Sequence, residues 1–161
     1  MCWLCVHPNA KWPDYLDYMR GLIDTDGWAV QAVQRDRLRP PWAYTVGLTA
    51  AGLPELVVTG MSAHRAMHLL DDVAEHVLHA GALVPGGQHA LEGGPLIEVV
   101  ELAEPTAHLV VAVELYGKGI RAQQIVHADE RGHWPWDVGY RGVRGGQPVL
   151  GVRAAPSAGA A

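Results

Sequence analysis

Residues 42–80 read WAYTVGLTAAGLPELVVTGMSAHRAMHLLDDVAEHVLHA, and this stretch decides the fold. Two short runs rich in β-branched and aromatic residues, 42–48 and 55–59, predict strands that the turn-like AAGLP separates. Ser62 is a good N-cap for a helix over 63–80, and Gly81 closes that helix. Its apolar residues predict a single core face made of Ala63, Ala66, Met67, Leu70, Val73, Ala74, Val77 and Leu78.

The flanking segments continue the alternation of helices and strands. Pro13 suits the first turn of a helix that Gly27 ends, and a strand is predicted over 28–35. Downstream, 85–94 predicts a loop or short hairpin, whereas 96–102 and 120–127 predict strands. The apolar spacing over 109–116 favours a helix, although its valines would suit a strand equally well.

These elements predict an α+β fold. Strands separated by two or three helices, with both short and long connections, favour a mixed or antiparallel sheet with two or three helices packed on it. We expect one globular domain, 13–151, after a lead-in, 1–12, and before a disordered tail, 152–161. No glycine-rich phosphate loop and no nucleophile-elbow motif occurs in the sequence.

The composition excludes several classes of protein. A net charge of −5 argues against a domain that binds nucleic acid, because such domains usually carry a basic excess. No stretch approaches the roughly twenty apolar residues of a membrane helix. The N-terminus has no basic region before an apolar run, and 2 cysteines do not make a secreted disulfide framework. We therefore expect a cytoplasmic protein without nucleic-acid or membrane partners, and the sequence leaves a homo-oligomer open.

Cys2, Cys5 and His7 form a C-x-x-C-x-H motif in the lead-in. Two thiolates at this spacing can bind one zinc ion, and the imidazole would add a third ligand. A fourth ligand would have to come from far along the chain, and the loop around 127–133 offers the best chemistry. Zinc is thus the one cofactor the sequence suggests, beside two alternatives: a redox pair and a small apolar anchor without chemistry.

The helix over 63–80 also carries His64, His68, Asp72 and His76 at intervals of four. Neighbouring pairs share a face, and histidines four apart are a familiar zinc pair. A step of four drifts by about 40° per repeat on a helix of 3.6 residues per turn, so the outer two cannot share a metal. We interpret this row as a solvated face.

The segment 123–140, QQIVHADERGHWPWDVGY, holds the densest chemistry in the chain. His127 and Asp129 lie two apart, so a persisting strand would place them on one face, where the carboxylate would orient the imidazole for acid–base work. Tyr44 is the third catalytic candidate. The residues Trp134, Trp136, Gln124 and Gln147 are the candidates for ligand binding.

A structural interpretation of the same segment stays open beside the catalytic one. Asp129 would then bind backbone amides in a capped turn, and the two tryptophans would cover a core edge. Tyr44, Glu55 and Gln147 would form a buried polar network that holds the ends of the sheet.

Several ordered motifs resemble those of a known family. They are Gly27-Trp28, YTVGL (44–48), PELVV (54–58), the strand 124–129 with Gly132, Pro135-Trp136 and QPVL (147–150). Together they are similar to the family called domain of unknown function 4262, from about Asp14 to Leu150, and CWLCVHP (2–8) resembles the lead-in of actinobacterial members. The resemblance implies a small, stand-alone, cytoplasmic bacterial protein and implies no activity, cofactor or catalytic residue.

Three interpretations of the function therefore stay open. The favoured one is a non-catalytic binding or regulatory module. The alternatives are a small enzyme with a pocket lined by Tyr44, His127, Asp129, Trp134 and Trp136, and a protein with structural zinc at the N-terminal motif. Convergence of Tyr44, His127 and Asp129 in one concave pocket would favour the enzyme.

Overall fold

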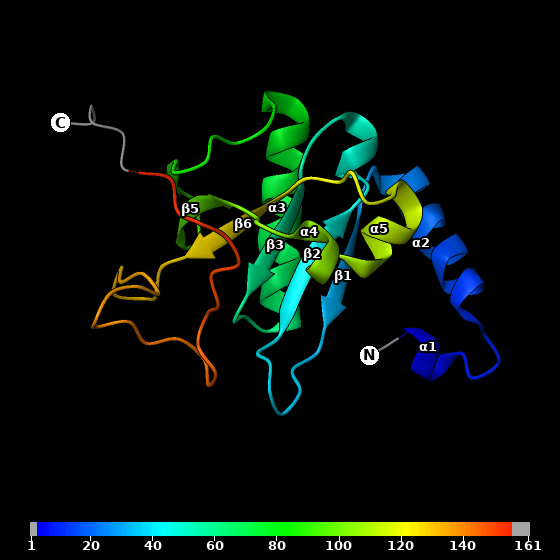
Figure 1. Ribbon diagram of the computed structural model, residues 1–161, viewed down its shortest axis with the longest axis horizontal. Coiled ribbons are helices and arrows are strands. Elements are labelled where there is room, and N and C mark those ends of the chain that lie inside the picture. Colours follow the sequence, from blue (N-terminus) through cyan, green and yellow to red (C-terminus); the bar gives the residue numbers. More distant parts are fainter. Residues whose placement is uncertain (1–2, 156–161) are drawn as a thin grey trace.

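The structure is a computed structural model that describes residues 3–155 (Figure 1). Its sheet has the strand order β1-β2-β3-β6-β5-β4. The strands are β1 (Ala29–Val33), β2 (Trp42–Val46), β3 (Glu55–Thr59), β4 (Gln88–Ala90), β5 (Leu96–Glu101) and β6 (Ala122–His127). β3 and β6 pair in parallel, and the other neighbours pair antiparallel. The chain is thus a single α+β domain with a mixed sheet, which confirms the predicted fold class.

Helices cover both faces of the sheet. They are α1 (Trp3–Val6), α2 (Trp12–Asp26), α3 (Ala63–Ala80), α4 (Pro105–His108) and α5 (Val110–Tyr116), with a 3-10 turn, η1 (Leu48–Ala51). α3 runs behind the strands in Figure 1, and α2 and α5 stand together to their right. Two apolar clusters follow from this arrangement, one under α3 and one under α2 and α5. No helix within residues 3–155 is long and apolar enough to span a membrane.

The core face of α3 differs from the predicted one. Its buried residues are Ala66, Leu69, Leu70, Val73, Ala74 and Val77. Met67 and Leu78, both assigned to the core from the sequence, are 45% and 37% exposed, and Ala63 is exposed too. At 100° per residue Met67 and Leu78 lie about 90–110° from the centre of the buried arc, so they flank the contact with β1, β2 and β3. Leu69 lies inside that arc and takes their place.

The lead-in is more ordered than its sequence suggested. It contains the short helix α1, and α2 begins at Trp12, one residue before the predicted Pro13. Trp3 stacks on His7 with ring centroids 4.2 Å apart and on Tyr18 at 5.0 Å. These ring contacts hold α1 against α2, because paired aromatic rings bury large areas of apolar surface.

Glu55 fixes the turn that joins β2 to β3. Its carboxylate accepts hydrogen bonds from the Thr45 hydroxyl at 2.7 Å, from the Gly47 amide at 3.0 Å, and from both the amide and the hydroxyl of Thr49. Gly47 has a φ of +130°, and a Cβ there would lie 2.9 Å from the carbonyl oxygen of Gly27. The motif YTVGL…PEL therefore encodes one tight, fully bonded turn beside α2.

The C-terminal segment returns to the sheet. Gly151 forms a bridge with Leu102, and a Cβ at this position would lie 1.9 Å from the carbonyl oxygen of Glu101, so only glycine fits. Two nitrogens of the Arg153 guanidinium donate to the two oxygens of Glu98, at 2.7 and 2.9 Å. The disordered tail was expected from residue 152, but Arg153 is held in place, and residues 156–161 lie outside the described part of the chain.

Candidate functional site

A groove of about 990 Å³ opens where α3 begins and where β6 ends. Its walls are the first half of α3, the segment 91–96, and the loop after β6, which projects from the lower left of Figure 1. The polar lining side chains are Ser62, His64, Arg65, His68, Asp72, Glu92, His127, Asp129, Glu130, Arg131, Tyr140 and Arg141. The apolar ones are Met61, Leu69, Leu91, Pro95, Leu96, Ala128 and Val143. The groove thus offers both charged and apolar contacts to a ligand.

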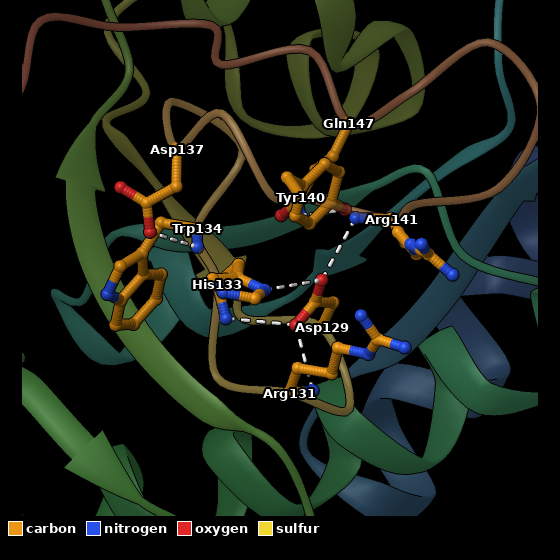
Figure 2. A network of polar contacts seen from close by, with 8 residues as sticks. All are labelled: Asp129, Arg131, His133, Trp134, Asp137, Tyr140, Arg141 and Gln147. Atoms are coloured by element: carbon orange, nitrogen blue, oxygen red, sulfur yellow. Dashed lines mark hydrogen bonds and ion pairs between the residues drawn. The ribbon is translucent and has the colours of Figure 1, made fainter.

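Asp129 organises the loop after β6 (Figure 2). One carboxylate oxygen accepts the amides of Arg131 and His133, and the other accepts the amide of Arg141, all at 2.9 Å. The side chain is only 5% exposed. Burial raises the pKa of Asp129, but the amides of His133, Arg141 and Arg131 outweigh it and lower that pKa to about 2. Asp129 is therefore a structural anion that ties two distant parts of the loop together.

This bonding predicts how stability depends on pH. An aspartate in an unfolded chain has a pKa of about 3.9. Because the native value is lower, the stabilisation by Asp129 is complete above that pH and is lost as the pH falls towards about 2. Asp129→Asn should lower the free energy of unfolding at neutral pH and should reduce its further loss between about pH 4 and pH 2. Urea unfolding at a series of pH values measures this acid arm of the stability profile. Asp24→Asn, at an exposed position on α2, is the control, and identical acid arms for Asp129→Asn and the native protein would contradict the assignment.

His127 lines the groove but is held as part of the fold. Its Nε2 lies 3.2 Å from the carbonyl oxygen of Thr59, so that nitrogen donates. Burial lowers the pKa of His127, against the raising effect of its backbone contacts with Thr59 and Ala128. The predicted pairing with Asp129 is not made, because β6 ends at His127 and the Asp129 oxygens face loop amides.

Tyr44 does not join His127 and Asp129. It packs in the apolar cluster under α2 and α5, on the opposite face of the sheet from α3. Its hydroxyl oxygen accepts the amide of Val111 at 3.1 Å, and burial raises its pKa. The three catalytic candidates therefore do not share one pocket.

The two glutamines bind backbone. Gln124 donates to the Pro148 carbonyl at 2.7 Å and accepts the Leu150 amide at 2.7 Å, which fastens the C-terminal segment to β6. Gln147 accepts the amide of His127 and donates to its carbonyl, as an added strand would. Tyr44, Glu55 and Gln147 are all structural, as the alternative interpretation proposed, but each has its own partners, so they are not one network.

The comparisons with known proteins bear on the family. The model of the family described as "Domain of unknown function (DUF4262)" matches residues 22–141, which is most of the chain. The protein belongs to the DUF4262 family. Searches of curated proteins and of solved structures found no match to this chain.

The two candidate tryptophans of this DUF4262 domain lie outside the groove lining. Trp134 and Trp136 stack with their ring centroids 5.4 Å apart. The Arg153 guanidinium lies 3.5 Å from the centroid of the Trp136 ring, in a cation–π contact. Trp136 is half-buried by these contacts, so it neither walls the groove nor is largely buried, as its two predicted roles would require. The pair connects the loop after β6 to the C-terminal segment.

The zinc motif falls partly outside the described residues, because Cys2 lies there. Cys5 is exposed on α1, and the Nδ1 of His7 is 2.8 Å from the carbonyl oxygen of Trp3. Within residues 3–155 no group of three or more His, Cys, Asp or Glu side chains is placed to hold a metal. Zinc at Cys2, Cys5 and His7 stays a prediction, which elemental analysis of the purified protein tests.

Sequence reasoning did not bring the arginines of the groove together in one site. Arg65, Arg131 and Arg141 line it, and in the described part of the chain none of their guanidinium groups has a hydrogen bond or an ion pair. The row His64, His68, Asp72 and His76 is exposed, as predicted for a solvated face, and its first three members also line the groove. No local motif joins the arginines, because loop folding brings them to one site.

Proposed function

We propose that this DUF4262 protein is a non-catalytic module that binds a small ligand in the groove. One contrast supports the proposal. The acid–base candidates from the sequence, His127 and Asp129, are bonded to backbone. The groups suited to recognition, Arg65, Arg131 and Arg141, line the groove, and within residues 3–155 their guanidinium groups have no hydrogen bond or ion pair. Side chains that fold the protein cannot exchange protons with a substrate without giving up those bonds.

The enzyme alternative has weaker support. It needs Tyr44, His127 and Asp129 around one reacting atom, together with the wall formed by Trp134 and Trp136. Of these five residues only His127 and Asp129 line the groove. The arrangement therefore lacks a nucleophile beside a base.

We also propose a cytoplasmic bacterial location, on the family resemblance and the low cysteine number.

Incubation with a small-molecule extract of the source organism tests binding against catalysis. The protein is separated by ultrafiltration, its bound fraction is released by denaturation, and both fractions are compared by mass spectrometry. We expect at least one compound to be retained with its mass unchanged. Consumption of a compound with the appearance of a new product, or retention of nothing, would overturn the proposal.

A pair of variants tests whether the retained compound binds in the groove. Ser62→Trp places a bulky ring at the exposed start of α3, on the groove wall, and should abolish retention. Lys118→Trp, at an exposed position outside the groove, should retain as much as the native protein. Equal retention by both variants would place the ligand elsewhere on the molecule.

A further inference from the structure

We propose that the ligand of the groove is a small organic phosphate monoester, whose phosphate group lies among Arg65, Arg131 and Arg141. This inference rests on the proposed binding function and names its ligand class. A guanidinium group binds phosphate oxygens through paired N–H donors, which is why arginine predominates at phosphate sites. Three such groups line this one groove, and none of them has a partner among the residues that the structure describes.

The anchoring of Arg131 and Arg141 brings the backbones of these two residues together. Their backbone amides bind different oxygens of the same Asp129 carboxylate, each at 2.9 Å. In Figure 2 both guanidinium groups extend to the same side of the loop, away from Trp134. Asp129 is thus a positioning residue that holds the backbones of the two arginines together, although they lie ten positions apart in the chain.

Arg65 contributes the third cation from the opposite wall. It lies in the first turn of α3, and its charge acts on the pKa of His127, which lines the groove between the two walls. The Ser62 side chain makes no capping hydrogen bond, so the first-turn amides of α3 add further donors at this end. The positive end of the helix dipole reinforces the charge of the arginines.

The acidic side chains of the groove define where the phosphate cannot lie. Asp129 is already engaged, and Glu130 adjoins Arg131. Asp72 follows Arg65 by seven positions on α3, about 10 Å along the helix axis. Glu92 also lines a neighbouring cavity of about 210 Å³, with Val73 and His76. The α3 wall of the groove is therefore cationic at the start of the helix, at Arg65, and acidic further along it, at Asp72.

The remaining lining fits an apolar ligand body. Leucine side chains line the groove on α3 and on the segment 91–96: Leu69, Leu91 and Leu96. A phosphate group at the arginines would therefore leave the organic part of the ligand over these leucines. Three cations also match a doubly charged phosphate better than a singly charged carboxylate. Phenyl phosphate combines both features and serves as the probe.

Titration calorimetry at low ionic strength tests the assignment. The ligands are phenyl phosphate, benzoate as a monoanion, and benzyl alcohol as a neutral analogue. The variants are Arg65→Gln and Arg131→Gln, whose exposed side chains have no hydrogen bond or ion pair within residues 3–155, with Arg37→Gln at an exposed position in the loop 34–41 as control. Circular dichroism confirms that each variant is folded.

We expect phenyl phosphate to bind most tightly and each groove variant to weaken it about tenfold or more, because each removes a charge-assisted hydrogen-bond donor. Arg37→Gln should bind as the native protein does. Equal affinity for benzoate, or an affinity for phenyl phosphate that the groove variants leave unchanged, would overturn the phosphate assignment. So would an absence of phenyl phosphate binding. The proposed binding function would survive these results if the extract experiment still showed retention that Ser62→Trp abolishes.

Discussion

Leu70→Ala should lower the free energy of unfolding by about 2–5 kcal/mol, the usual range for a buried leucine cut to alanine. Leu70 is fully buried in the cluster under α3, and this helix packs on β1, β2 and β3. The loss combines the transfer energy of the removed atoms with the cavity that they leave. Urea unfolding followed by circular dichroism measures it.

Met67→Ala is the matched control on the same helix. Met67 is 45% exposed, and alanine is a good helix former, so we expect a change below about 0.5 kcal/mol. The sequence pattern alone placed Met67 and Leu70 on one core face, and the two variants therefore distinguish the structural face from the predicted one. A Met67 variant as damaging as the Leu70 variant would mean that α3 is rotated on the sheet.

Glu55→Ala should cost at least about 3 kcal/mol, since two backbone amides and two hydroxyls lose their acceptor, at about 1–3 kcal/mol for each donor that is buried. The donors are the amides of Gly47 and Thr49 and the hydroxyls of Thr45 and Thr49. They lie in the turn between β2 and β3, so the turn should also gain mobility, which hydrogen exchange of those amides measures.

Two variants bracket this effect. Glu55→Gln keeps one carbonyl oxygen as an acceptor and should lose less stability than Glu55→Ala. Glu114→Ala removes an exposed glutamate of α5 and should change stability by less than about 0.5 kcal/mol. A Glu55→Ala protein with unchanged stability and unchanged amide exchange would show that the carboxylate does not hold the turn.

Much of the fold could be predicted from local patterns. The caps and apolar period of α3 gave its bounds correctly, from Ala63 to Ala80. The runs 42–48 and 55–59 contain β2 and β3, because β-branched and aromatic residues between turn signals are a local property. The parallel pairing of β3 with β6 could not be predicted from local patterns, since it depends on packing between residues more than sixty positions apart.

The edges of the patterns were less predictable. On α3, Ala74 lies just inside the buried arc of the helix and Met67 lies just outside it. The sequence does not give the width of that arc. The lead-in shows no apolar period, yet Trp3 orders it by packing on Tyr18. Such contacts between side chains leave no mark on helical or strand periodicity.

The candidate site was predicted only in part. The densest polar segment does form a wall of the groove, and His127 and Asp129 do line it. The sequence left two interpretations of Asp129 open, and the structure has the capped turn, because the chain turns at Asp129 and its carboxylate accepts three loop amides. The sequence did not show that the arginines share one site, because Arg65 comes from a helix and Arg141 from a loop, and only the fold brings them together.

The amide spectrum of nitrogen-15-labelled protein titrated with phenyl phosphate tests the central claim most directly, because it locates the ligand on the molecule. The account predicts shifts concentrated at the groove amides of Arg65, Gly93, Gly132 and Arg141, with the remote amides of Gly21 and Gly119 unmoved. Shifts centred on the aromatic residues of α1 and α2, or a spectrum without change at the groove, would contradict it.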